Sequence, residues 1–247
     1  TKENIMIVLK RQISKNNSKK LSIGEDGALV IPEGYISIGK EAFSQNKELK
    51  NVSLPSTMKK IGIGAFFACS NLTSINIPNG VRLIERSAFS RCASLSSISI
   101  PSGVIIIGDD AFHSCSMLKS VEIPNTVKYI GDWAFKFCMS LHSVEIPNSV
   151  KYIGHSAFAS CNLTSIAIPN GVKYIEDFAF HDCMLESITI PDSVKHIGKF
   201  AFTGLLSVNI TFEGTLAKWA AISKDEKFID GVKEYVIHCV DGDIAKA

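Results

Sequence analysis

The sequence predicts an α/β solenoid of about eight stacked coils, each 22 or 23 residues long. All eight prolines recur at that interval, in five steps of 23 residues followed by two of 22. An Ala-Phe pair keeps the same interval, with its phenylalanine eleven residues after each proline. Because one such unit is too small to bury its apolar residues alone, a repeat of this length indicates coils that stack on their neighbours.

The first half of each coil is predicted to be a short strand and a turn. In the copy at residues 118–141, Leu118, Val121 and Ile123 have the spacing of a strand that turns its apolar residues inward. Pro124 ends that strand, since proline has no N–H for the ladder and favours the first corner of a turn.

The second half of each coil is predicted to be a short helical turn opposite the strand. Its apolar residues recur at i, i+1, i+4 and i+7, as Ala134, Phe135, Cys138 and Leu141 do in this copy. Asp132 precedes them as an expected N-cap, as do Asp109 and Asp177 in two other copies.

Proline, glycine, Ala-Phe and cysteine together make the repeat similar to that of a known family. The copies from Pro55 to Phe202 resemble the BspA-type leucine-rich repeat, which reads approximately L-x-x-I-x-I-P-x-x-V-x-x-I-G-x-x-A-F-x-x-C. The resemblance implies a curved, right-handed leucine-rich-repeat stack with a parallel β-sheet on its concave side. It also implies a bacterial protein, at the cell surface or secreted, that binds host or matrix proteins or other cells.

The chain divides by its pattern into a solenoid and two flanking segments. The solenoid is predicted to cover residues 21–212, with an N-terminal cap at 1–20 and a C-terminal cap at 213–247. The N-terminal cap has apolar residues at helical spacing: Ile5, Val8, Leu9 and Ile13. The C-terminal cap is expected to combine a last strand at 235–240 with an apolar helix face: Leu216, Trp219, Ala220 and Ile222.

Composition excludes several classes of protein. The formal net charge is +2, and no basic arm interleaved with aromatic residues indicates a nucleic-acid site. The apolar run Ile5–Leu9 is much shorter than the roughly 20 residues that a membrane-spanning helix needs. We therefore expect neither a nucleic-acid partner nor a membrane span, and we expect a monomer.

Six of the seven cysteines share one position of the repeat, which raises the question of chemistry. They are Cys69, Cys92, Cys115, Cys138, Cys161 and Cys183. A metal ladder or a catalytic thiol is the functional alternative, but no C-x-x-C pair or histidine at ligand spacing accompanies them. The sequence favours buried free thiols, with Cys239 more exposed, and predicts no catalytic residue, no metal and no cofactor.

Small polar residues are expected to line the concave sheet. The candidate concave face comprises Ser97, Ser120, Glu122, Ser143, Glu145 and Ser165. One interpretation is a solubilising ladder of cross-strand hydrogen bonds, and the other is a shallow docking surface.

On four successive coils, a lysine is followed directly by a tyrosine or a histidine. We call this set of residues the Lys–Tyr stripe, and it comprises Lys128, Tyr129, Lys151, Tyr152, Lys173, Tyr174, Lys195 and His196. The lysines either discourage edge-to-edge aggregation or, with the tyrosines, attract an acidic protein or glycan.

The sequence thus predicts a non-catalytic protein-binding scaffold that resembles a cell-surface adhesin. Its ligand is expected to be a protein or a glycan. The alternatives are a structural spacer that displays another domain and, less favoured, an enzyme with a Cys/His centre.

Overall fold

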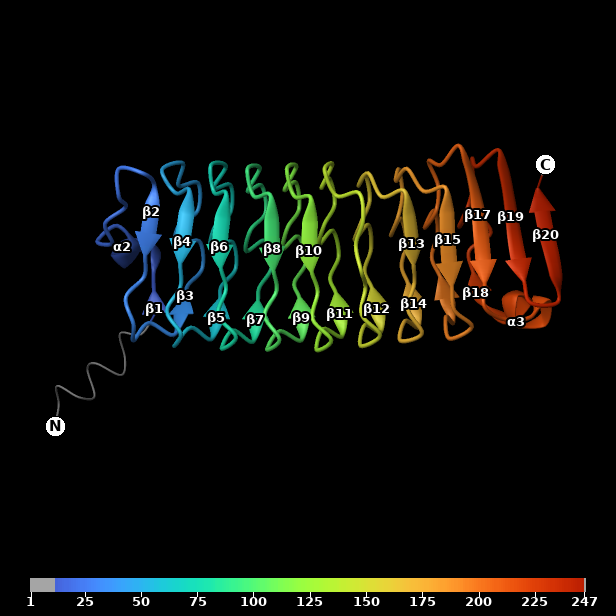
Figure 1. Ribbon diagram of the computed structural model, residues 1–247, viewed down its shortest axis with the longest axis horizontal. Coiled ribbons are helices and arrows are strands. Elements are labelled where there is room, and N and C mark those ends of the chain that lie inside the picture. The colour runs from blue at the N-terminus through green and yellow to red at the C-terminus, as the bar shows by residue number, and fades with distance from the viewer. Residues whose placement is uncertain (1–11, 247) are drawn as a thin grey trace.

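A computed structural model describes residues 12–246, which wind into a stack of short coils set side by side in a row (Figure 1). The fold is a parallel-strand β-solenoid with little helix, which confirms the predicted solenoid. Of the residues predicted to form the N-terminal cap face, Ile5, Val8 and Leu9 lie outside the described range. Ile13 is buried in a strand rather than in a helix.

One side of the stack is a parallel sheet that the sequence analysis did not predict. Within residues 12–246 it contains ten two-residue strands, about one for each turn of the solenoid. They are β1 (Gln12–Ile13), β3 (Ser37–Ile38), β5 (Lys60–Ile61), β7 (Leu83–Ile84), β9 (Ile106–Ile107), β11 (Tyr129–Ile130), β12 (Tyr152–Ile153), β14 (Tyr174–Ile175), β16 (His196–Ile197) and β18 (Ser223–Lys224). We call it the second sheet. The count exceeds eight because β1 and β18 belong to the terminal segments.

The strands that precede seven of the eight prolines form the predicted parallel sheet, which continues into three strands beyond the last proline, the final one antiparallel. We call it the first sheet. In the described residues it falls into three parts. These are β2 (Ala28–Val30), β4 (Asn51–Ser53) and β6 (Ser74–Asn76); β8 (Ser97–Ser99) and β10 (Ser120–Glu122); and β13 (Ser165–Ala167), β15 (Ser187–Ile190), β17 (Ser207–Phe212), β19 (Glu234–Cys239) and β20 (Gly242–Lys246). The second break, at residues 143–145, coincides with the change from 23-residue to 22-residue coils.

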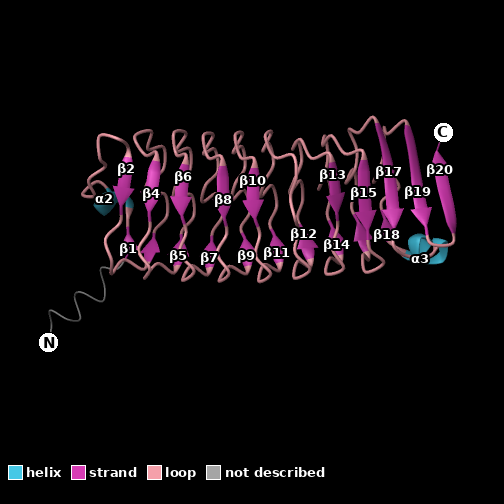
Figure 2. Cartoon of the chain, viewed as in Figure 1, coloured by secondary structure: helices cyan, strands magenta, loops and turns pink. Residues whose placement is uncertain are grey.

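The third side consists of turns where the sequence predicted short helical turns (Figure 2). Trp133 and Phe137 have φ of 54° and 61°, values that a right-handed helix does not allow. Their N–H groups donate to His155 O and Ala159 O of the next coil, at 2.8 and 3.0 Å. The helical prediction was wrong in this detail because these hydrogen bonds run between coils rather than along the chain.

The aspartates predicted to cap helical turns serve the neighbouring coil instead. Asp109 Oδ1 accepts from Asp132 N at 3.1 Å, and Asp132 Oδ1 accepts from His155 N at 2.8 Å. Asp177 Oδ1 accepts from Lys199 N at 2.7 Å. Each carboxylate therefore satisfies a backbone donor that the turn leaves free.

The core is built from columns of equivalent residues, as the repeat predicted. Eight phenylalanine rings from Phe43 to Phe202 form one continuous stack, with centroids 5.2–5.5 Å apart and planes within 8°. All of these rings are buried. The distance between rings is the spacing of the coils, so each ring fills the space that its neighbours leave.

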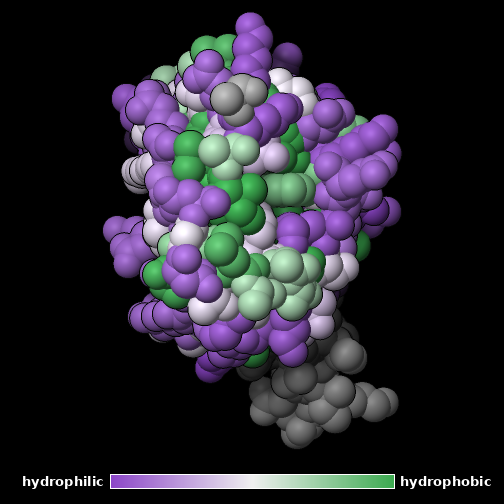
Figure 3. All heavy atoms as spheres, turned by 90° about the vertical axis from the view of Figure 1, so that its right-hand side faces the viewer, coloured by the Kyte–Doolittle hydropathy of each residue, from purple (hydrophilic) through white to green (hydrophobic). Residues whose placement is uncertain are grey.

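Helices occur in the described residues at the two ends of the stack, as α2 (Lys15–Ser18) and α3 (Leu216–Ala221) (Figure 2). In α3, Trp219 is buried against Phe212 and Phe228, while Ala220 is exposed. The antiparallel strand β20 lies last in the first sheet. Hydrophilic side chains surround a hydrophobic strip on this end of the molecule (Figure 3).

Candidate functional site

The Lys–Tyr stripe lies along the second sheet, on four consecutive coils. Register pairs Tyr129 with Tyr152, Tyr152 with Tyr174, and Tyr174 with His196. Each ring-bearing residue begins a two-residue strand whose second residue is a buried isoleucine. The stripe therefore faces away from the core, and the second sheet holds it in line.

The four lysines of the stripe are joined through their backbones. Lys151 N donates to Lys128 O at 2.8 Å, Lys173 N to Lys151 O at 2.9 Å, and Lys195 N to Lys173 O at 2.9 Å. Among residues 12–246, no carboxylate lies within ion-pairing distance of these four ammonium groups. The result is a row of four adjacent positive charges without a direct ion pair in the described residues, although Asp192 lies close enough to Lys173 to feel its charge.

The tyrosine rings beside these lysines are partly open to solvent. Tyr129 and Tyr174 are 49% and 46% exposed, and the Tyr129 and Tyr152 rings lie 6.2 Å apart at 47°. Burial, together with the negative charges of Glu176 and Asp132, raises the pKa of Tyr152 to about 12. Its hydroxyl therefore stays protonated well above the pH at which an exposed tyrosine ionises.

Three carboxylates close to Tyr152 were not predicted as part of the site. Asp109, Asp132 and Glu176 are close enough to Tyr152 to act on its titration. The recurrence of Asp109, Asp132 and Asp177 at one repeat position was the available signal, but it was interpreted as helix capping. The second sheet therefore carries a basic and an aromatic row. Asp109, Asp132 and Glu176 come from coils on either side of that of Tyr152 and from two positions of the repeat, and we call these three carboxylates the acidic row.

The candidate concave face is exposed but discontinuous. Ser97 and Ser120 pair in register, and Ser99 Oγ donates to Glu122 Oε2 at 2.8 Å. Ser143 and Glu145 lie in the coil that contributes no strand to the first sheet, whereas Ser165 lies beyond it in β13. No hydrogen bond between serine side chains of this row is formed in residues 12–246, so the continuous ladder is absent there.

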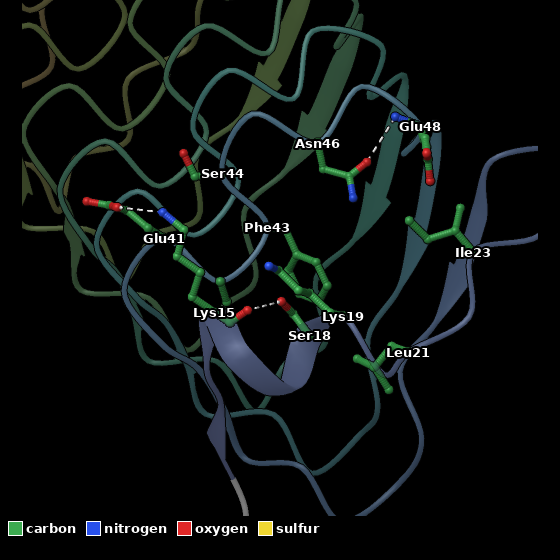
Figure 4. A pocket seen from close by; sticks show the side chains of 11 residues that line it. Lys15, Ser18, Lys19, Leu21, Ile23, Glu41, Phe43, Ser44, Asn46 and Glu48 are labelled. Carbon is green, nitrogen blue, oxygen red and sulfur yellow. Dashed lines mark hydrogen bonds and ion pairs between the residues drawn. The ribbon is translucent and has the colours of Figure 1, made fainter.

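A hollow of about 430 Å³ occurs on this face where the sheet is interrupted. Glu122 and Glu145 line it from neighbouring coils, with Asn125 and Asn148 beside them. Another pocket of about 430 Å³ lies at the N-terminal end, between α2 and the coil that carries Phe43 (Figure 4). An ion pair between Lys15 Nζ and Glu41 Oε2, 3.5 Å apart, crosses its edge. Neither hollow belongs to the Lys–Tyr stripe.

The six repeat cysteines are free and buried, as predicted. Each thiol donates to the carbonyl of the phenylalanine in the preceding coil, for example Cys115 Sγ to Phe89 O at 3.2 Å. Burial raises the pKa of Cys69, Cys115 and Cys183 to about 12. A thiol held protonated in this way is a poor nucleophile and a poor metal ligand.

Thiol labelling tests this burial directly. Under native conditions at pH 7.5, we expect a thiol-specific reagent to modify only Cys239, which is partly exposed. All seven cysteines should react in denaturant. The Cys239→Ser variant is the control and should take up no label while folded. Rapid labelling of a repeat cysteine in the folded protein would contradict this burial and support the alternative of an enzyme with a Cys/His centre.

Groups of ionisable residues with the geometry of a metal site are absent from residues 12–246. None of the helices in that range has the length and apolar character needed to cross a bilayer. Both findings concern only the described part of the chain.

The repeat also identifies the family. The sequence profile of the BspA type leucine-rich repeat region, with six copies, matches residues 27–142 and 128–221. The chain belongs to the BspA-type leucine-rich repeat family. For this leucine-rich repeat protein, the family supports the general role of a protein-binding scaffold, and solenoids of this family are typically non-catalytic.

Several solved leucine-rich repeat structures are similar. A protein from Bacteroides ovatus shares 29% identity at a TM-score of 0.73, over 87% of this chain and 64% of its own. A cell surface protein from Faecalibacterium prausnitzii shares 27% identity at 0.52, over 79% and 74%. The leucine-rich repeat protein of T. pallidum shares 31% identity at 0.54, over 73% and 77%. This chain thus spans about two thirds of the Bacteroides protein. None of the curated proteins compared with the chain matches it.

Proposed function

We propose that this leucine-rich repeat protein is a non-catalytic scaffold, displayed at a bacterial surface, that attaches to host matrix proteins or other cells through the Lys–Tyr stripe. The row of Lys128, Lys151, Lys173 and Lys195, which forms no ion pair within residues 12–246, carries the proposal. Similarity to a Faecalibacterium cell surface protein supports the location.

Electrostatics favours a binding role for this row. Neighbouring strands lie about 4.8 Å apart, and two like charges at that separation repel by about 0.9 kcal/mol in bulk water. Alternating charges would keep the surface soluble and also stabilise the sheet, since opposite charges on adjacent strands attract each other. An acidic partner removes the repulsion and gains from long-range attraction.

The second sheet is also a better docking surface than the first. Its ladder is continuous from β1 to β18, whereas the first sheet is interrupted at residues 143–145. Tyrosine rings provide rigid contact area at low entropic cost, and aromatic residues are enriched at protein interfaces. We therefore assign the partner to the second sheet.

Removing the three rings tests the proposal. We expect the combined Tyr129→Ala, Tyr152→Ala and Tyr174→Ala variant to attach to matrix-coated surfaces and to cells at least tenfold less well, since loss of a single interface aromatic residue often costs more than about 1 kcal/mol and about 1.4 kcal/mol is a factor of ten. Retention is measured by surface plasmon resonance and by cell counts.

The matched control removes three other exposed apolar side chains. Met117, Phe137 and Met139 are 49%, 39% and 54% exposed on the turn side. Their combined alanine variant should attach like the wild type. If the tyrosine variant attaches as well as the wild type, the Lys–Tyr stripe is not the binding surface, and the alternative of a structural spacer is favoured.

A further inference from the structure

The basic and aromatic rows of the second sheet, together with the acidic row, suggest the chemistry of the partner. The basic row is Lys128, Lys151, Lys173 and Lys195; the aromatic row is Tyr129, Tyr152, Tyr174 and His196; the acidic row is Asp109, Asp132 and Glu176. Register and the backbone bonds between successive lysines keep the basic and aromatic rows parallel to the long axis of the stack.

The basic row fits a linear anion better than a single charged group. Its four charges lie on adjacent coils, joined by backbone hydrogen bonds of 2.8–2.9 Å, without ion pairs in the described residues. A monovalent ligand relieves the repulsion at only one point of the row. A polymer with regularly spaced anions neutralises the whole row and releases its own counterions as it binds.

The aromatic row narrows the class of polymer. Each lysine is followed directly by a ring, so each of the four coils offers one cation and one flat surface. A polymer whose units each carry an anion and a ring repeats the same pair. A polypeptide of acidic residues alone, such as poly-glutamate, lacks rings. In an extended chain its same-face side chains recur at about 6.6 Å, against about 4.8 Å for neighbouring strands.

The acidic row separates an acidic sugar polymer from a nucleic acid. Asp109 and Asp132 each accept one backbone N–H, at 3.1 and 2.8 Å, and a carboxylate can accept further hydrogen bonds. Sugar hydroxyl groups are donors that these carboxylates can accept. A single-stranded nucleic acid that stacks its bases on the tyrosines would place a densely charged phosphate backbone close to both rows, where the carboxylates repel it.

We infer that the second sheet binds a linear acidic polysaccharide that lies along the axis of the solenoid. Its anionic groups contact the basic row, its sugar rings pack on the aromatic row, and its hydroxyl groups donate to the acidic row. The inference rests on the proposed function, because it names the partner of the same surface. Host matrix and cell surfaces would then be recognised through their acidic glycan chains.

Polygalacturonate, with one carboxylate on each sugar, is the first probe, and heparin tests whether sulfate serves as well. We expect the wild-type protein to bind polygalacturonate, to bind it at least tenfold more weakly at 300 mM than at 50 mM salt, and not to bind neutral dextran. Poly-glutamate and single-stranded DNA represent the two competing classes. Equal or tighter binding of either one would overturn the inference.

Matched variants distinguish the contribution of the lysine charges to binding from that of the tyrosine rings. Lys128→Glu, Lys151→Glu and Lys173→Glu together should abolish binding of polygalacturonate. The same charge change at the exposed Lys47, Lys50 and Lys119 should leave it within twofold. The triple Tyr→Ala variant should bind at least fivefold more weakly, and the triple Tyr→Phe variant should retain most of the affinity. An unaffected Tyr→Ala variant would overturn the packing of sugar rings.

Attachment to cells distinguishes failure of this inference from failure of the proposed function. If the charge-reversal variant loses attachment while the wild-type protein binds no acidic glycan, only the polysaccharide is wrong. If the variant attaches as well as the wild type, the stripe is not the binding surface. Circular dichroism of every variant confirms that the fold is retained.

Discussion

Replacing Phe135 by alanine is expected to destabilise the protein by about 3–5 kcal/mol. The ring is fully buried in the phenylalanine stack, 5.3 Å from Phe112 and 5.2 Å from Phe158. Because Phe135 N donates to Ala157 O of the next coil, the backbone cannot move inward to fill the space. The loss therefore includes both buried apolar area and a cavity.

Phe137 supplies the control, since it has the same side chain but is 39% exposed. We expect Phe137→Ala to cost less than about 1 kcal/mol, as surface changes generally do. Urea unfolding followed by circular dichroism measures both. Similar losses at the two positions would show that the stack is not the main source of stability. A second transition in the Phe135→Ala protein alone would mean that the weakened coil lets the two halves unfold separately.

Columns of the repeat predicted the core because burial depends on residue type. Each proline-anchored column that reads apolar in the sequence, from Val127 and Ile130 to Phe135 and Cys138, is buried in the structure. In a solenoid every inner coil packs between two similar coils. The inward-facing positions of one copy of the repeat are therefore the inward-facing positions of the others. The inward positions could therefore be assigned without coordinates.

The second sheet and the turn side were harder to predict because their hydrogen bonds are not local. A strand of two residues, such as Tyr129–Ile130, is too short to show alternation. Trp133 and Phe137 take positive φ without being glycine, and nothing in an aromatic residue type signals that conformation. The apolar spacing of this segment resembles a helix, although alternate N–H groups, those of Trp133, Phe135 and Phe137, donate to the next coil.

For the proposed binding surface, too, the repeat position of each residue could be predicted from the sequence, but its contacts with neighbouring coils could not. The lysines and tyrosines of the stripe could be collected by their repeat position. The absence of ion pairs from these lysines within residues 12–246, and the proximity of Asp132 and Glu176 to Tyr152, depend on how neighbouring coils pack, which cannot be inferred from a single sequence. Asp109 and Asp132 could be collected by their repeat position, but the proximity of these residues and of Glu176 to Tyr152 was visible only in the structure.

Alkaline pH is expected to destabilise the protein steeply through its buried thiols. An exposed thiol ionises near pH 8.5, whereas burial raises the pKa of Cys115 to about 12. Below about pH 8.5 both the folded and unfolded states keep the proton. Between there and about pH 12 only the unfolded state loses it, so the free energy of unfolding falls by up to about 1.4 kcal/mol per pH unit for each such thiol.

A single Cys115→Ala substitution isolates one of these titrations. At pH 7 the variant should be less stable than the wild type, because it loses buried volume and the hydrogen bond from Cys115 Sγ to Phe89 O. From pH 9 to pH 10, urea unfolding under reducing conditions should show that difference shrinking by about 1.4 kcal/mol, since the variant has one thiol fewer to ionise when unfolded. Cys239→Ala, which removes a partly exposed thiol, should alter the pH dependence much less. A constant difference between the Cys115→Ala and wild-type proteins would mean that this thiol ionises as easily in the folded chain as in the unfolded one, and that the cysteine column is not sealed from water.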